Sequence, residues 1–155
     1  MSDKTKGNFL VAAQFGLLAA LVLIPRQICL PANALAFGLN LVGLILLLAG
    51  FAVLAIALLG LGKSLTANPV PKDDGKLVTS GLYKLVRHPI YSGLLLIGLG
   101  VTVQSYLLPH IVVWAVLWML LEYKAAFEET MLEARYAEYA AYKAKTGRFI
   151  PKLRR

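Results

Sequence analysis

Three long uncharged tracts run through this sequence and limit the folds open to it. They cover residues 7–25, 27–62 and 89–121, and each reaches the roughly 18 residues that a membrane-spanning helix needs. Of the 155 residues, 59% are apolar and only 15% are charged, unlike the more even mixture of soluble domains. We therefore expect an all-α integral membrane protein, with residues 1–155 forming a single domain.

The third tract predicts two spans rather than one. As a single helix, residues 89–121 would measure about 50 Å against a hydrocarbon core of about 30 Å, so a break is required. Residues 105–110 supply it and make a helical hairpin, with His110 expected to be solvated in the outer turn. The last helix is expected to continue beyond the membrane to about Lys145. The predicted spans are 8–24, 34–61, 89–104 and 109–127.

The basic residues favour the same four-span topology. With four spans, every Lys and Arg except Arg26 lies on one side, whereas three spans would move the basic residues of 124–155 to the other side. Because basic residues collect on the cytoplasmic side, we expect both termini there, in the cell membrane. The loop 63–88 and an amphipathic region 128–155 are predicted on the same side. The formal net charge of +8 then indicates contact with anionic membrane lipids and no nucleic-acid partner.

Two smaller features complete the organisation. The 34–61 span is rich in Gly and Ala, which permit close approach of another helix. The loop after it has the turn composition Pro69, Pro71, Asp73, Asp74 and Gly75. Cys29 is the only cysteine, so the chain has no internal disulfide and no support for a cysteine-based metal site; it is interpreted as a small apolar filler.

A polar cluster borders the third apolar tract and is the strongest functional signal. Residues 80–93 read SGLYKLVRHPIYSG, and the pair Glu128-Glu129 follows some thirty-five residues later. Charges at a membrane border are costly and usually serve a purpose. The predicted topology places both stretches on one face, where they can form one site. Because Pro89 suits the first turn of a helix, His88 is expected just before it.

Each of these residues also has a simpler interpretation. Arg87 and His88 could reach lipid phosphates, and Glu128 could pair with Lys124 one turn earlier. For Glu129 the local sequence offers repulsion from Glu133 and no cation at the helpful spacing, so we expect a cation from elsewhere. Two further patterns are most simply explained by packing between helices. They are the tyrosines at 136, 139 and 142, and the pair Gly98 and Gly100.

These motifs resemble the integral membrane methyltransferases that include isoprenylcysteine carboxyl methyltransferase and the phospholipid N-methyltransferases. The resemblance covers roughly residues 60 to 151. It is carried by residues 77–83 and 87–93, Glu128-Glu129, Leu132, Arg135-Tyr136, Tyr139, Tyr142 and Pro151.

The resemblance implies S-adenosylmethionine as methyl donor, S-adenosylhomocysteine as product and a lipid-phase small molecule as acceptor. It places Tyr83, Arg87, His88, Tyr91, Gly98, Gly100, Glu128 and Glu129 at the cofactor. Arg135 is expected to orient the acceptor, with Glu129 as its partner in the reaction centre. The acceptor could be a prenylcysteine carboxylate, a lipid amine or a hydrophobic thiol. Two other functions remain open: an NADPH-dependent membrane reductase of the sterol-reductase type, and a non-catalytic membrane subunit.

Overall fold

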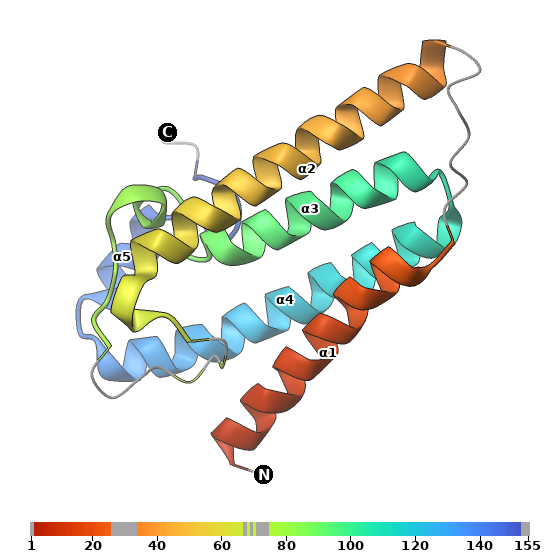
Figure 1. The fold of residues 1–155 in the computed structure, drawn as a ribbon. Coiled ribbons are helices and arrows are strands. Elements are labelled where there is room, and N and C mark those ends of the chain that lie inside the picture. Colours follow the sequence, from red (N-terminus) through yellow and green to blue (C-terminus); the bar gives the residue numbers. More distant parts are fainter. Residues whose placement is uncertain (1, 26–33, 67, 69, 71–74, 153–155) are drawn as a thin grey trace.

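The computed structural model describes residues 2–25, 34–66, 68, 70 and 75–152 (Figure 1). Within these ranges the chain is helical, and its only bridge between extended segments joins Val86 to Gly147. The α-helices are α1 (Asp3–Leu23), α2 (Ala34–Leu61), α3 (Pro89–Ser105), α4 (Leu108–Arg135) and α5 (Tyr139–Lys145), with the short 3-10 helices η1 (Gly62–Ser64) and η2 (Gly81–Lys84). Helices α1, α2 and α4 are long and apolar enough to cross a membrane, and α3 is a shorter apolar helix. The chain is an all-α integral membrane protein.

The helix boundaries follow the apolar tracts closely. Helix α2 has the predicted bounds, and the predicted break in the third tract is confirmed. There α3 ends at Ser105, Tyr106 adopts a left-handed conformation with φ of 54°, and α4 begins at Leu108. Helix α1 begins five residues earlier than expected, at Asp3, because the Ser2 hydroxyl caps it by accepting a hydrogen bond from the backbone N–H of Thr5.

Helices α2 and α3 lie side by side and are joined by a seam of glycines (Figure 1). A Cβ at Gly50 would lie 2.9 Å from the backbone oxygen of Gly93, and a Cβ at Gly100 would lie 2.7 Å from that of Gly43. Both distances are shorter than real Cβ atoms allow, so only glycine permits this approach of the two backbones. The predicted role of the small residues in the second span is confirmed.

The prediction that the last helix continues to about Lys145 is wrong. Helix α4 ends at Arg135, Tyr136 is extended with φ of −118° and ψ of 111°, and α5 starts at Tyr139. The break turns α5 back toward η2, where the Tyr142 hydroxyl donates a hydrogen bond to the carbonyl oxygen of Tyr83 and Tyr139 becomes buried. Tertiary contacts of this kind outweigh the weak preference of the intervening residues for a continuous helix.

The prediction that His110 is solvated is also wrong. The turn between α3 and α4 is tight, so the first turn of α4 packs against the last turn of α3 and covers the imidazole completely. The Thr102 hydroxyl, itself buried, donates a hydrogen bond to the backbone oxygen of His110 at 3.4 Å. Four other expectations lie outside the described residues: the packing of Cys29, the side on which Arg26 lies, and the turns at Pro69 to Pro71 and at Asp73-Asp74.

Two distant parts of the chain meet at one end of the helical bundle: residues 75–88, and α5 with the C-terminal segment that follows it (Figure 1). The backbone N–H groups of Arg87 and His88 donate to the carbonyl oxygens of Gly147 and Arg148 at 2.8 and 3.1 Å. The Ser92 hydroxyl, one turn into α3, donates to the carbonyl oxygen of Phe149 at 2.8 Å. The C-terminal segment therefore fixes the start of α3, where the polar cluster lies.

Candidate active site

The carboxylate of Glu129 is the centre of a buried ion-pair network. Arg87 Nη2 lies 2.9 Å from Glu129 Oε1, while Arg148 Nη2 and Lys143 Nζ lie 3.0 and 3.4 Å from Glu129 Oε2. The side chain of Glu129 is 2% exposed and that of Arg87 is 7% exposed. The expected cation from elsewhere in the chain is confirmed, and three are present. Arg87 is held inside the protein, which contradicts the alternative that it reaches lipid phosphates.

Arg148 connects the C-terminal segment to this network through both ends of its guanidinium. Its Nη1 donates to Glu122 Oε2 at 2.6 Å, and its Nε and Nη2 donate to Glu129 at 3.2 and 3.0 Å. These hydrogen bonds, first those to Glu129, raise the pKa of Arg148 above its usual value. Arg148 is therefore a permanent cation that joins two carboxylates on α4.

His88 lies between the two acidic residues, as the last residue before Pro89 and α3. Its Nε2 is 3.2 Å from Glu129 Oε1, and its Nδ1 is 3.7 Å from Glu128 Oε2. A carboxylate paired with arginines can only accept, so Nε2 is the nitrogen that carries a proton. The Tyr91 hydroxyl donates to Glu128 Oε2 at 3.0 Å, and its ring stacks on the imidazole with 5.3 Å between centroids. The predicted meeting of the two polar stretches is confirmed.

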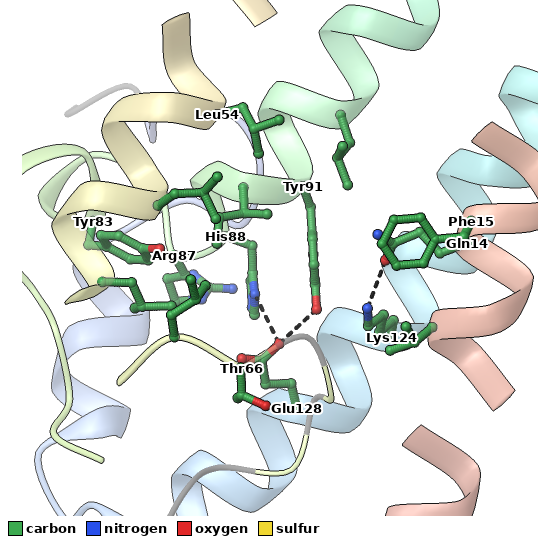
Figure 2. A pocket seen from close by; sticks show the side chains of 16 residues that line it. Gln14, Phe15, Leu54, Thr66, Tyr83, Arg87, His88, Tyr91, Lys124 and Glu128 are labelled. Carbon is green, nitrogen blue, oxygen red and sulfur yellow. Dashed lines mark hydrogen bonds and ion pairs between the residues drawn. The ribbon is translucent and has the colours of Figure 1, made fainter. Parts of the chain in front are cut away.

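A cavity of about 420 Å³ opens beside this cluster (Figure 2). Of the residues expected at the cofactor, five line it: Tyr83, Arg87, His88, Tyr91 and Glu128. The opposite wall is mostly apolar and comes from α1, α2 and α3, with Val11, Phe15, Leu54, Leu58, Ile90 and Leu94. Gln14 and Lys124 also line the cavity, joined by a hydrogen bond of 2.7 Å. The cavity therefore presents polar and apolar walls to the same ligand, at a volume typical of small-molecule sites.

A second, smaller cavity of about 90 Å³ shares the residues Tyr83, Arg87, His88 and Glu128 with the first. Its other walls come from residues 75–78 and from the three tyrosines at 136, 139 and 142. Burial raises the pKa of Tyr142 to about 12 and raises those of Tyr83 and Tyr139 further. All three hydroxyls are therefore protonated at neutral pH, and those of Tyr83 and Tyr142 donate hydrogen bonds to the backbone oxygens of Ala57 and Tyr83.

Four of the predicted site residues line neither cavity: Gly98, Gly100, Arg135 and Glu129, the last of which contacts the wall residues Arg87 and His88. A Cβ at Gly98 would lie 2.9 Å from the ring of Trp114, so this glycine serves the packing of α3 on α4, and Gly100 belongs to the seam with α2. Arg135 is exposed at the last residue of α4, with its guanidinium 5.6 Å from the centroid of the Tyr136 ring. The alternative pairing of Lys124 with Glu128 is present as an electrostatic attraction, while each side chain hydrogen-bonds elsewhere: Lys124 Nζ donates to Gln14 on α1, and Glu128 accepts from the Tyr91 hydroxyl.

Sequence reasoning missed four residues of the site: Arg148, Lys143, Lys124 and Gln14. For Arg148 and Lys143 the signal was the unexplained charge of Glu129, which required cations without identifying them. Lys124 could have been found from its position, since it is a charged residue within one helical turn of the end of an apolar tract of spanning length. For Gln14, the only signal in the sequence was that an uncharged polar residue lies within the first apolar tract.

The chemistry of these walls suits a ligand with both charged and apolar parts. Glu128 can hold a cationic group, the aromatic rings can cover a planar one, and the apolar wall can take a hydrocarbon tail. Among the residues that the structure describes, no group of three or more His, Cys, Asp or Glu side chains is placed to hold a metal ion.

Comparison with known proteins agrees with this arrangement. Residues 42–134 match the model of the isoprenylcysteine carboxyl methyltransferase family. A protein of Oryza sativa subsp. indica named "Probable protein-S-isoprenylcysteine O-methyltransferase" is 32% identical over 114 residues, which cover 71% of this chain and 60% of the rice protein. Protein-S-isoprenylcysteine O-methyltransferase A of Arabidopsis thaliana is 26% identical over 159 residues, 96% of this chain and 81% of that protein.

A third relative carries a different name. The cobalt-zinc-cadmium resistance protein CzcN of Cupriavidus metallidurans is 35% identical over 86 residues, which cover 53% of this chain and 38% of that protein. For comparison, the chain covers 60% of the length of the rice relative, which is less than two thirds of that protein.

Proposed function

We propose that this chain, which belongs to the isoprenylcysteine carboxyl methyltransferase family, is an S-adenosylmethionine-dependent methyltransferase whose acceptor is dissolved in the membrane. The observation that carries the proposal is the convergence of Arg87, His88 and Glu128 on one cavity that also has an apolar wall, with the buried Glu129 holding Arg87 and His88 in place. One wall suits a charged donor and the other a hydrocarbon acceptor.

The residues present fit S-adenosylmethionine. The ligand carries an ammonium group and a sulfonium, and Glu128 is a carboxylate on the cavity wall that can attract both. The rings of Tyr83 and Tyr91 offer flat surfaces beside it, and the Arg87 guanidinium is fixed by Glu129. When bound, the donor supplies a methyl group whose bond to sulfur breaks with the electron pair remaining on sulfur, which leaves S-adenosylhomocysteine.

The contribution of the protein is to bring the acceptor into line with the methyl group and to exclude water. The buried Glu129 network holds His88 at the start of α3 and so fixes the wall on which Glu128 and Tyr91 meet. Glu129 is therefore proposed as a positioning residue beside the reaction centre. Arg135, exposed at the end of α4, would orient the acceptor from outside the cavity.

The acceptor is proposed to be a prenylcysteine carboxylate or a lipid amine. The name of the rice relative states an O-methyltransferase of protein S-isoprenylcysteine, which is the first of these classes. A carboxylate acceptor loses no proton, whereas an amine acceptor must lose one, and Glu128 is the carboxylate placed to accept it. The apolar wall formed by α1, α2 and α3 would receive the hydrocarbon tail in either case.

The proposed membrane arrangement has four spans, with α3 as the third. Both termini and the site then lie on the cytoplasmic side of the cell membrane, where the water-soluble donor is available. The clustering of basic residues outside the apolar tracts supports this orientation. Membership of a methyltransferase family disfavours the reductase and the non-catalytic subunit.

Two measurements test the function. Membranes that contain the protein are incubated with S-adenosylmethionine radiolabelled in its methyl group, and a labelled lipid-phase product is expected and then identified. Calorimetric titration of the purified protein with S-adenosylhomocysteine is expected to show binding. A folded protein that binds NADPH and no S-adenosylhomocysteine would overturn the proposal in favour of a reductase.

A further inference from the structure

The two ring nitrogens of His88 differ in their surroundings. Nε2 lies 3.2 Å from Glu129 Oε1 and carries a proton, because that carboxylate can only accept a hydrogen bond. In the neutral imidazole the lone pair is then on Nδ1, which lies 3.7 Å from Glu128 Oε2, farther than a hydrogen bond reaches (Figure 2). His88 and Glu128 both line the large cavity. His88 therefore has a basic nitrogen on the same side as the carboxylate of the cavity wall.

The imidazole of His88 is held in one orientation by its neighbours. The ring of Tyr91 stacks on it with 5° between the planes, and the ring of Phe149 meets it edge-on with 6.2 Å between centroids. The backbone N–H of His88 donates to the carbonyl oxygen of Arg148 at 3.1 Å. A base acts only when its lone pair is directed at the proton that it removes, and these contacts fix the direction of Nδ1.

The charges around His88 permit both a neutral and a protonated imidazole. Glu129 faces Nε2, and its charge is matched by three cations: Arg87, Lys143 and Arg148. Glu128 faces Nδ1, accepts from the Tyr91 hydroxyl and is attracted to Lys124. Neither acid therefore requires a protonated imidazole as its partner, yet both would stabilise one that formed.

Glu128 alone is poorly suited to remove a proton from the acceptor. In the proposed function it attracts the cationic groups of the donor, and it does so as an ionised carboxylate. A carboxylate that stays ionised beside a cation is a weak base, whereas an imidazole takes up and gives up protons near neutral pH. His88 and Glu128 can divide these two tasks between them.

We propose that His88 is a catalytic base, held in the required tautomer by Glu129, and that the acceptor is a thiol or an ammonium whose reacting atom arrives with a proton. The inference rests on the proposed function and narrows its acceptor, because a carboxylate has no proton to lose at neutral pH. The S–H or N–H bond of the acceptor breaks, and the proton passes to Nδ1. The electron pair of that bond forms the new bond to the methyl carbon, while the bond from this carbon to the donor sulfur breaks and leaves its pair on sulfur. The imidazolium, between Glu128 and Glu129, releases its proton to water before the next turnover.

The first test compares three acceptors with the same tail: dodecanethiol, dodecylamine and dodecanoate. Methyl transfer from radiolabelled S-adenosylmethionine is measured with the purified full-length protein at neutral pH and saturating donor. The thiol or the amine is expected to react faster than the carboxylate, and the one that reacts identifies the methylated atom. A wild type that methylates the carboxylate as fast as the other two overturns the inference.

Two variants separate a base from a residue that only shapes the cavity. His88→Gln keeps an N–H group for Glu129 and removes the basic nitrogen, so kcat with the thiol or amine is expected to fall about a hundredfold or more, with partial rescue by added imidazole. The matched control is Phe149→Leu, which loosens the packing on the ring and leaves both nitrogens in place. A smaller loss without rescue is expected there. A folded His88→Gln protein that keeps the wild-type kcat, or loses no more than Phe149→Leu does, overturns the role.

A second readout needs no catalysis and no donor. The chain has two histidines, so nitrogen NMR of protein labelled in its histidine rings contains two imidazoles, and a His88→Gln or His110→Gln sample assigns them. At neutral pH the wild type is expected to carry a proton on Nε2 of His88 and none on Nδ1. A proton on Nδ1 overturns the inference, whether or not any of the three acceptors reacts.

These measurements also separate the inference from the proposed function. A wild type that binds S-adenosylhomocysteine and methylates only carboxylates contradicts the base alone. A folded wild type that does not bind S-adenosylhomocysteine contradicts the methyltransferase proposal.

Discussion

The imidazole Nε2 of His88 lies 3.2 Å from Oε1 of Glu129, although the two residues are 41 positions apart in the chain. His88 precedes α3 and Glu129 lies near the end of α4, so this contact joins the two helices at the site. The same carboxylate pairs with Arg148, which brings the C-terminal segment to the same point. One acidic side chain thus holds together three parts of the chain.

Removing the charge of Glu129 is expected to be strongly destabilising. In Glu129→Gln, the cations Arg87 and Arg148 would lose a buried partner, which typically costs about 3–5 kcal/mol. Thermal unfolding of the purified protein in detergent measures the loss. The matched control is Glu133→Gln, because Glu133 is exposed and pairs with Lys143 at the surface, where such pairs contribute about 0–1 kcal/mol. Equal losses in the two variants would contradict the role of Glu129.

Glu128 is expected to act on ligand affinity with little effect on stability. Its side chain is 26% exposed and faces the large cavity, and Glu128→Gln removes the charge without changing the shape. Loss of a charge-assisted hydrogen bond predicts an S-adenosylhomocysteine affinity lower by about tenfold or more. Calorimetry measures the change.

Tyr91→Phe is the control for Glu128, since it deletes only the hydroxyl that donates to that carboxylate. A smaller decrease in affinity is expected, because the negative charge remains in the cavity. If Glu128→Gln binds S-adenosylhomocysteine as the wild type does, Glu128 is not the group that holds the donor.

Much of the fold could be predicted because apolar length is a local property. The bounds of α2, the break after Ser105 and the close helix contacts at Gly50 all follow from hydropathy, helix length and residue size. The meeting of His88 with Glu129 also followed, because the predicted topology placed both on one face. These inferences need no knowledge of how the side chains pack.

The remaining features depend on tertiary contacts that no local pattern records. The break at Tyr136 exists because α5 packs back on η2, and Arg148 reaches Glu129 only because the C-terminal segment pairs with the chain before α3. His110 is buried by the tightness of one turn. In each case a short polar or mixed segment has several equally good local conformations, and its neighbours in space select one.

Alkaline pH is expected to destabilise the protein through its buried tyrosines. In the folded state burial raises the pKa of Tyr142 to about 12, whereas an unfolded chain has tyrosine pKa values of about 10. The unfolded state therefore releases protons first, so stability is retained below pH about 10 and falls as the pH rises toward about 12. Thermal unfolding as a function of pH, together with tyrosinate absorbance, measures the effect.

Tyr142→Phe assigns part of this pH dependence to one residue. At neutral pH the variant is expected to be less stable by about 1 kcal/mol, since it lacks the hydrogen bond to the Tyr83 carbonyl oxygen. Between pH 10 and 12 its stability is expected to fall less steeply than that of the wild type, because one group fewer titrates. An unchanged slope would contradict the assignment to Tyr142.

Gly147 is expected to be irreplaceable, because the backbone folds over it. A Cβ at this position would coincide with the carbonyl group of Ile150. The carbonyl oxygen of Gly147 itself accepts a hydrogen bond from the backbone N–H of Arg87. Gly147→Ala must therefore displace the C-terminal segment and with it Arg148. We expect a lower melting temperature and a weaker affinity for S-adenosylhomocysteine, measured by thermal unfolding and calorimetry.

Gly16→Ala is the control: a Cβ there meets open space, so the substitution is expected to be neutral or stabilising by up to about 1 kcal/mol through helix propensity. If both variants behave as the wild type does, the C-terminal segment does not hold the site in place.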